Sequence, residues 1–464
     1  MKTRNMRAVN LTLLVFVLLA GHVLAQGTYR FRHVGIEDGL SQGSVYHMLK
    51  DSQGFLWLGS QDGINRFNGK NFEVYLSGAS GESTNIQGIA EDKDGTVWIG
   101  SHKGMYQYNR KRNKFIKHEF ANKANIGSVH AFMDRKKNVF FLSEAGLFSL
   151  INNDIHLITD QLRYSRSQFN NFVATTPGGE IWLLNPGKGV MRYSHRTKKT
   201  KQYFANPASD TEFSCITADR KGDIWLGGRQ KLIHIDCKSE KITMHQVKWP
   251  STGISLCYIT EDLNGKLWLA TEKNGIILYD PLIKHTIQQI QHEDDNINSL
   301  KFNEVSEILI DENNDVFANT DPQGIDIITS VPSAFACYSY GKKAEYNLSG
   351  YSVRGLAEDE NDDIWLGTEL GGLNRLTPST GKVKHYTTKD GLPDNIVRYV
   401  LRDPSGSMWV ATLNGLALYI PESESFRSFE LPVFCEVSNF LSLDSNTLLL
   451  ITSKGIMLFD KQKM

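Results

Sequence analysis

The sequence predicts an all-β protein, a β-propeller made of four-stranded antiparallel blades. Three observations predict this fold: a motif that recurs about ten times at a spacing of 40 to 49 residues, strand-like alternation inside each unit, and frequent turn residues. No helical period of 3.6 residues appears within the units. Since a helical solenoid needs helices and a horseshoe needs shorter units, a propeller is the architecture that fits.

The repeated unit reads D-x-x-G-x-hydrophobic-W-hydrophobic-G-[ST], followed by G-[LI]-x-x-[YF]. In the first unit, "GSVYHMLKD", "FLWLGS", "GINRF" and "NFEVYL" read as four strands. We expect the Asp to accept backbone N–H groups in the hairpin turn between the first two strands, and the Trp to fill the wedge between neighbouring sheets. We expect the Gly after the Trp to allow close packing. The aromatic position is occupied by Trp57, Trp98, Phe140, Trp182, Trp225, Trp268, Phe317, Trp365 and Trp409, and by Leu449 in the last unit.

These units resemble the two-component regulator propeller repeat. The segments that carry the resemblance are residues 31–75, "FRHVGIEDGLSQGSVYHMLKDSQGFLWLGSQDGINRFNGKNFEVY", and residues 385–419, "HYTTKDGLPDNIVRYVLRDPSGSMWVATLNGLALY". The resemblance implies the periplasmic sensor region of a hybrid two-component system, which typically senses oligosaccharides. In that family, fourteen blades in two propellers usually precede a β-sandwich, a membrane helix and a histidine kinase. With about ten units and no kinase motif, this chain is expected to be a truncated or split sensor, or a stand-alone propeller.

Ten units allow two arrangements. Family habit favours a seven-bladed propeller over residues 26–345 and three blades of an incomplete second propeller over residues 346–464. The alternative is a single ring of ten blades, in which the strand-like "YRFRHV" near the start would complete the last blade. The sequence alone leaves both open.

The first 25 residues predict a signal peptide. A basic start with Lys2, Arg4 and Arg7 precedes an apolar run, and "VLA" ends at Ala25. The run is short for a membrane span, although an uncleaved anchor is the alternative. We therefore expect a periplasmic or secreted protein, with no membrane span after the signal peptide.

The composition narrows the function classes. A formal net charge of zero argues against a nucleic-acid partner. The five Cys are widely spaced without a C-x-x-C pair, so neither a disulfide framework nor a zinc site is predicted. No phosphate loop, H-E-x-x-H or G-x-S-x-G motif occurs, so we expect no catalytic residues, no metal and no cofactor.

The joins that vary between units are the candidate ligand-binding loops. Several of them carry basic residues, which would suit an anionic sugar, although scattered surface cations are the alternative interpretation. Trp249, beside a Pro in "VKWPSTG", is a candidate platform for a sugar ring or a loop anchor, and Tyr164 lies in an equivalent join. The basic candidates are His102, Lys103, Lys188, Arg229, Lys231 and Lys273.

Three functions remain open from the sequence. The first is a sensor module that binds an oligosaccharide and lacks its own kinase. The second is a secreted glycan hydrolase or lyase, because two blades could bring carboxylates together. The third is a protein-binding scaffold. The partner could also be the remainder of a split sensor kinase or a second copy of the chain.

Overall fold

The computed structural model describes residues 29–78, 83–118, 127–152, 154–163, 171–185, 189–204, 213–294, 296, 298–330, 338, 340–341, 347–432 and 435–463. The chain divides into two compact units. The first unit comprises Met1–His292 with Asn298–Pro332, and the second comprises Glu293–Ile297 with Ser333–Met464. The predicted all-β propeller fold is confirmed, because the described strands form small antiparallel sheets of consecutive strands.

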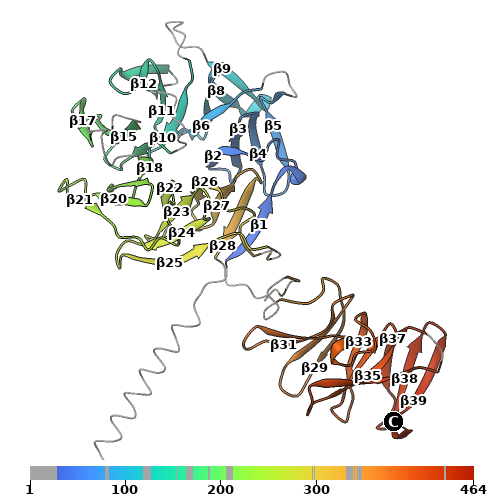
Figure 1. The fold of residues 1–464 in the computed structure, drawn as a ribbon. Helices are drawn as coiled ribbons and strands as arrows, with labels where there is room; N and C mark the ends of the chain where they lie inside the picture. Colours follow the sequence, from blue (N-terminus) through green and yellow to red (C-terminus); the bar gives the residue numbers. More distant parts are fainter. Residues whose placement is uncertain are drawn as a thin grey trace, which may run out of the picture. The chain divides into compact units, whose positions relative to one another are not determined.

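Seven four-stranded sheets build the first unit, and we call them blades one to seven (Figure 1). Around the centre, the first strand of blade one contacts those of blades two and seven, and similar contacts join blade two to blade three and link blades four to seven in order. The first strands are β2 (Val45–Lys50), β6 (Ile86–Glu91), β10 (His130–Met133), β14 (Val173–Thr175), β18 (Phe213–Ala218), β22 (Leu256–Glu261) and β26 (Val305–Ile310). The second strands are β3 (Leu56–Ser60), β7 (Val97–Ser101), β11 (Val139–Ser143), β15 (Glu180–Asn185), β19 (Ile224–Gly228), β23 (Leu267–Thr271) and β27 (Val316–Thr320).

The third and fourth strands lie progressively further from the centre. The third strands are β4 (Gly63–Phe67), β8 (Gly104–Asn109), β12 (Gly146–Ile151), β16 (Gly189–Ser194), β20 (Lys231–Ile235), β24 (Ile276–Asp280) and β28 (Ile325–Thr329). The fourth strands are β5 (Phe72–Tyr75), β9 (Lys114–His118), β13 (Asp154–Thr159), β17 (Lys199–Tyr203), β21 (Ile242–Met244), β25 (His285–Ile290) and, in blade seven, β1 (Arg30–Val34). Short 3₁₀ helices are η1 (Ile36–Asp38), η3 (Arg110–Arg112), η4 (Thr388–Asp390) and η5 (Lys461–Lys463).

Strand β1 joins the start of the chain to the seventh blade. It pairs antiparallel with β28, so the "YRFRHV" segment completes blade seven and not the tenth sheet. The Gly324 N–H donates to the Gly43 carbonyl at 3.0 Å, and the Lys50 ammonium lies 2.6 Å from the Asp311 carboxylate. These contacts join blade seven to blade one, as expected for a ring of seven and not for a ring of ten.

The second unit contains three further sheets. Blade eight has β29 (Val353–Glu358), β30 (Ile364–Thr368), β31 (Gly372–Thr377) and β32 (Lys382–Tyr386), and blade nine has β33 (Val397–Arg402), β34 (Met408–Thr412), β35 (Gly415–Ile420) and β36 (Ser425–Phe429). Blade ten has β37 (Val437–Ser442), β38 (Thr447–Thr452) and β39 (Gly455–Asp460). The proposed limit between residues 345 and 346 stays a prediction, since residues 342–346 lie outside the described residues.

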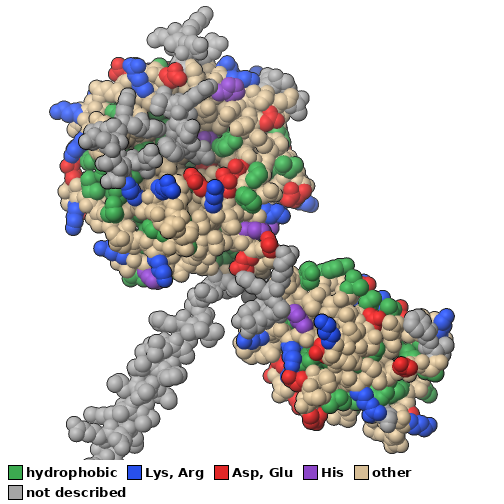
Figure 2. Space-filling model, viewed as in Figure 1, with side chains coloured by type: hydrophobic (Ala, Val, Ile, Leu, Met, Phe, Trp, Pro, Cys, Tyr) green, Lys and Arg blue, Asp and Glu red, His purple; other side chains and the backbone are tan. Residues whose placement is uncertain are grey.

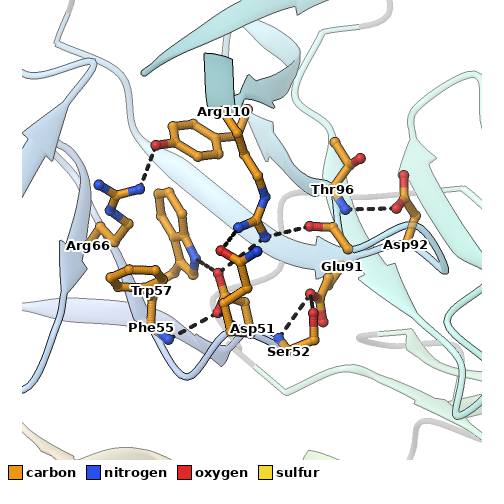
Figure 3. A network of polar contacts seen from close by, with 12 residues as sticks. Asp51, Ser52, Phe55, Trp57, Arg66, Glu91, Asp92, Thr96 and Arg110 are labelled. Carbon is orange, nitrogen blue, oxygen red and sulfur yellow. Dashed lines mark hydrogen bonds and ion pairs between the residues drawn. The ribbon is translucent and has the colours of Figure 1, made fainter. Parts of the chain in front are cut away.

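The repeat motif ties each turn to the wedge residue of its own blade. In blade one, Asp51 Oδ1 accepts the N–H groups of Gln53 and Phe55 at 3.0 Å, and Asp51 Oδ2 accepts the Trp57 indole N–H at 2.9 Å (Figure 3). The indole itself is fully buried. The same Asp–Trp bond occurs in blades two, five, six, eight and nine. The turn and packing roles predicted for Asp and Trp are confirmed, whereas the bond between them was not anticipated.

The glycine after the Trp allows the next blade to pack closely. A Cβ built on Gly59 would lie 2.6 Å from Ile86 Cγ2, and one on Gly100 would lie 2.3 Å from the Val129 carbonyl oxygen. Both distances are too short for a real side chain, so the predicted packing role of this glycine is confirmed.

Blades are also joined through the residue that precedes the motif Asp. Glu91 of blade two is buried and accepts the Ser52 N–H of blade one at 2.9 Å (Figure 3). Glu261 of blade six accepts the Arg220 N–H of blade five at 2.6 Å. In blade one, the residue before the motif Asp is Lys50, which carries the opposite charge and pairs with Asp311 of blade seven. The face that carries the D-x-x-G turns is thus bound together by structural contacts.

We predict that the indole N–H contributes more to the free energy of unfolding in blade five than in blade four. Trp225 donates to Asp219, whereas the buried Trp182 Nε1 has no hydrogen-bond partner among the described residues, because Thr176 stands in the Asp position. Trp225→Phe should therefore cost about 1–3 kcal/mol more in the free energy of unfolding than Trp182→Phe, since it leaves a buried acceptor unpaired. Trp225→Ala should cost about 3–5 kcal/mol. Chemical denaturation of the three variants tests this, and equal costs for the two Phe variants would contradict it.

We also predict that the second unit is the more protease-sensitive one. Its terminal sheets expose apolar side chains, including Leu356 on β29 at 66% and Ile456 and Leu458 on β39 at 70% and 67%. Strand β39 has no fourth strand beside it among the described residues, and such edges open easily. Limited proteolysis followed by mass spectrometry should leave a resistant fragment ending near residue 345. Equal resistance throughout residues 346–464 would contradict the prediction.

Candidate functional site

The first unit has two faces, and Figure 2 shows positively and negatively charged side chains scattered over the side of this unit that it draws. The D-x-x-G turns join first and second strands, and we call their side of the unit the turn face. The joins between second and third strands, and those from one blade to the next, lie at the opposite strand ends, and we call that side the loop face. The ligand-binding candidates that lie among the described residues belong to loop-face joins.

His102 and Lys103 lie in the loop-face join of blade two, and both are exposed. The His102 Nδ1 lies 3.1 Å from the Asn85 backbone nitrogen, and the Lys103 Nζ donates to the Ser83 carbonyl at 2.7 Å. Both side chains therefore contact the segment that enters their own blade.

The other basic candidates are spread over further blades. Arg229 is exposed in blade five and forms an isolated antiparallel bridge with Ser255, while Lys231 is partly buried at the start of β20. Lys273 is exposed in blade six. Lys188 and Tyr164 lie outside the described residues. A shared basic arc for an anionic sugar thus stays a prediction.

Trp249 is only partly buried, in the join between blades five and six. Its side chain packs against the core cluster that contains Trp225 and Ile254. The same join is held by Gln230, whose side chain donates to the Ser251 carbonyl at 3.2 Å. This is the position of a loop anchor that keeps part of its ring accessible, and its contact with a sugar stays a prediction.

Sequence reasoning missed a group of carboxylates on the same face. Glu272, Glu304 and Asp321 belong to blades six and seven, and the Asp321 N–H donates to the Glu304 carbonyl at 3.0 Å. Burial raises the pKa of Glu304, and the negative charges of Asp321 and Glu272 raise it further, against the opposing charge of Lys273. The signal was present in the joins "TEKN" and "NTDPQ", but only the basic residues of such joins were weighed.

Blade one completes this acidic group with a phenol. Tyr46 accepts a hydrogen bond from Gln61 Nε2 at 2.8 Å, and burial and the negative charge of Asp321 raise the pKa of Tyr46. Asp321 Oδ1 is buried without a hydrogen-bond partner among the described residues. Carboxylates and a hydroxyl in one region form a set of acceptors that suits the hydroxyl groups of a neutral sugar.

Several titratable side chains belong to the first strands, around the centre of the first unit. The rings of His47 on β2 and His130 on β10 meet edge to face at 5.4 Å between centroids. Burial lowers the pKa of His47 to about 3 and that of His130 to about 4. Burial raises the pKa of Glu307 on β26 to about 8 and raises the pKa of Tyr258 on β22. All four side chains are therefore uncharged near neutral pH, as a packed centre requires.

One cluster among the described residues has the composition of a metal site. The potential ligand atoms of Asp219, Asp223 and His234 lie within 4.8 Å of one another. However, Asp219 Oδ2 accepts the Trp225 indole N–H, and Asp223 Oδ1 accepts the Cys237 N–H at 2.9 Å. These atoms hold the repeat together, so the cluster is accounted for without an ion.

We predict that Glu307 makes the first unit less stable as the pH rises. The folded chain keeps a proton on Glu307 that the unfolded chain releases above its ordinary pKa of 4.5, so the free energy of unfolding falls up to about pH 8 and then levels off. Glu307→Gln should remove a slope of at most about 1.4 kcal/mol per pH unit. Denaturation between pH 6.5 and 8.5 measures it. The exposed Glu422→Gln is the control, and an unchanged slope in Glu307→Gln would contradict the prediction.

Comparison with known proteins identifies the repeat. Residues 39–62, 80–103, 347–369 and 391–414 match the model of the two-component regulator propeller, and these segments fall in blades one, two, eight and nine. The chain contains two-component regulator propeller repeats. The resemblance inferred from the sequence is thereby confirmed.

Solved structures show the same fold. The extracellular domain of the hybrid two component system BT3049 of B. thetaiotaomicron aligns with a TM-score of 0.62 and 24% identity, over 93% of this chain and 59% of that chain. The extracellular domain of BT4673 of the same organism aligns with a TM-score of 0.52 and 19% identity, over 94% and 59%. A curated relative, Histidine kinase P4 of Formosa agariphila, is 37% identical over 76 residues, which are 16% of this chain and 6% of the kinase.

The chain spans 59% of the length of the solved chains that it resembles and matches a small part of the kinase. Within the described residues, no helix is long and apolar enough to cross a membrane.

Proposed function

We propose that the chain is a ligand-sensing module that lies outside the cytoplasm and binds an oligosaccharide on the loop face of its first unit. Two of the solved chains with this fold are described as extracellular domains of two-component or one-component systems, and the curated relative is a histidine kinase. The basic and apolar first 25 residues support export of the chain, with a mature start near Gln26.

The observation that carries the proposal is the acidic group on the loop face, next to the join that carries the partly exposed Trp249. Glu272, Glu304, Asp321 and Tyr46 offer acceptors for sugar hydroxyls, and Trp249 lies in the join next to blade six. The Glu272 N–H donates to the Ser255 carbonyl at 3.2 Å, which ties the turn of blade six to the join that carries Trp249. A small number of precisely placed polar groups on a rigid scaffold is typical of a small-ligand site.

A second candidate function is hydrolysis or lysis of a glycan. The raised pKa of Glu304 beside two other carboxylates is the environment in which one carboxyl serves as an acid while another stays ionised. A protein-binding scaffold is a third candidate. The sensor is favoured because the chain resembles sensor regions and carries none of the catalytic motifs considered.

We predict that Asp321→Asn and Trp249→Ala each weaken oligosaccharide binding at least tenfold without unfolding the chain. Asp321→Asn removes the charge that strengthens a hydrogen bond from a sugar hydroxyl, and Trp249→Ala removes the ring. A glycan array with wild-type chain identifies the ligand, and calorimetry then compares the variants with Glu422→Gln, an exposed carboxylate of the second unit.

The same experiment separates the candidates. Binding without change to the glycan supports the sensor. Release of shortened or unsaturated sugars, lost in Glu304→Gln, would replace it with the enzyme. Failure of the array to show any glycan would contradict the proposal.

A further inference from the structure

Blade three departs from the repeat, and a hollow lies beside it on the turn face. Its aromatic residue is Phe140 in place of Trp, and its turn reads "DRKKN" without the usual glycine. Lys137 occupies the turn with a φ of 58°. Asn138 Nδ2 donates to Asp134 Oδ2 at 2.7 Å, so the amide replaces the indole N–H as a donor but not the indole as a filler of space.

The resulting cavity has a volume of about 670 Å³ and is lined by blades two, three and four. We call it the blade-three hollow. Val139 and Phe140 give it an apolar part, and Gly178 and Gly179 of blade four leave one side free of side chains. The volume is within the range of small-ligand sites, about 300–1,000 Å³.

Positive charges predominate among the exposed side chains that line the hollow. Asp92 and Asp134 are buried and bound within their own turns, and the Lys137 ammonium pairs with Glu91 of blade two. Three exposed cations also line the hollow: Lys93, Lys136 and Arg196. Among the described residues they form no ion pair, and the one exposed carboxylate beside them is that of Asp94.

We propose that the blade-three hollow binds an anionic sugar residue, one that carries a carboxylate or a sulfate. The guanidinium of Arg196 and the ammonium of Lys136 would bind the anionic group, and the accessible part of Phe140 would contact the sugar ring. Asp94 would accept a hydrogen bond from a hydroxyl. This site lies on the face opposite the proposed oligosaccharide site and does not depend on it.

The probes are tri-galacturonate, a sulfated heparin disaccharide and neutral maltotriose, each titrated into the full chain by calorimetry at two salt concentrations. At least one of the anionic probes should bind, and the one that binds distinguishes carboxylate from sulfate. Lys136→Ala/Arg196→Ala should weaken that binding at least tenfold. The matched control is Lys111→Ala/Lys238→Ala, which removes two exposed cations from strand-three to strand-four turns of the same unit, and it should change binding less than twofold.

A second variant tests the hollow without changing its charge. Phe140→Trp introduces the indole that five of the six other blades of the first unit, and blades eight and nine of the second, carry at this position. It should obstruct the anionic probe while the melting temperature is maintained. Asp321→Asn on the loop face should leave binding of the anionic probe unchanged.

Each remaining outcome overturns the inference. It fails if neither anionic probe binds, if the control pair weakens binding as much as Lys136→Ala/Arg196→Ala, or if Phe140→Trp binds as well as wild type. A loss of anionic binding in Asp321→Asn would place the anion on the loop face instead. Failure of the glycan array on the loop face, with anionic binding to the hollow intact, would overturn the proposed function alone.

Discussion

The hydrogen bond between the turn Asp and the Trp of the following strand, which is formed in blades one, two, five, six, eight and nine, is the interaction on which the propeller depends. One carboxylate accepts two backbone N–H groups with Oδ1 and the indole N–H with Oδ2, as in Asp51 and Trp57. It therefore fixes the hairpin and the wedge residue relative to each other within one blade. The indole is then presented in a constant position to the next blade, whose packing also relies on the glycine two residues after the Trp.

A chain of such blades needs a way to close. Blade seven takes its fourth strand, β1, from the start of the chain and its other three strands from residues 305–329. One sheet therefore holds both the first and the last strand of the ring. Lys50 of blade one meanwhile supplies a cation to Asp311 of blade seven, where Phe317 stands in place of the Trp. The seam is thus joined both by a ladder of backbone bonds and by a side chain that replaces the missing indole donor. The sheets of the second unit lack this closure in the described residues, which explains the apolar side chains exposed on β29 and β39.

Periodic features could be read from the sequence because each unit repeats the same local physics. The spacing of Asp, Gly and Trp predicted the turn, the strands and the buried wedge, and the family resemblance followed from the same residues. Contacts between blades follow no such period. Glu272, Glu304 and Asp321 influence one another from different joins, and no spacing in the chain marks that proximity. The basic residues were selected by charge alone, and those among the described residues lie on blades two, five and six.

Departures from the repeat distinguish individual blades, which the shared motif cannot do. Thr176 in blade four leaves the Trp182 indole without its acceptor, yet the ring still fills the wedge. In blade seven, Phe317 fills the wedge and Lys50 satisfies Asp311. In blade three, Asn138 satisfies Asp134, and Phe140 lies at the edge of an open volume that three exposed cations also line. Blade three thus keeps its turn, as blade seven does, and presents a hollow beside its aromatic residue. A substitution that preserves the turn and leaves a hollow beside the wedge residue is one way for a structural repeat to acquire a binding site while it keeps its fold.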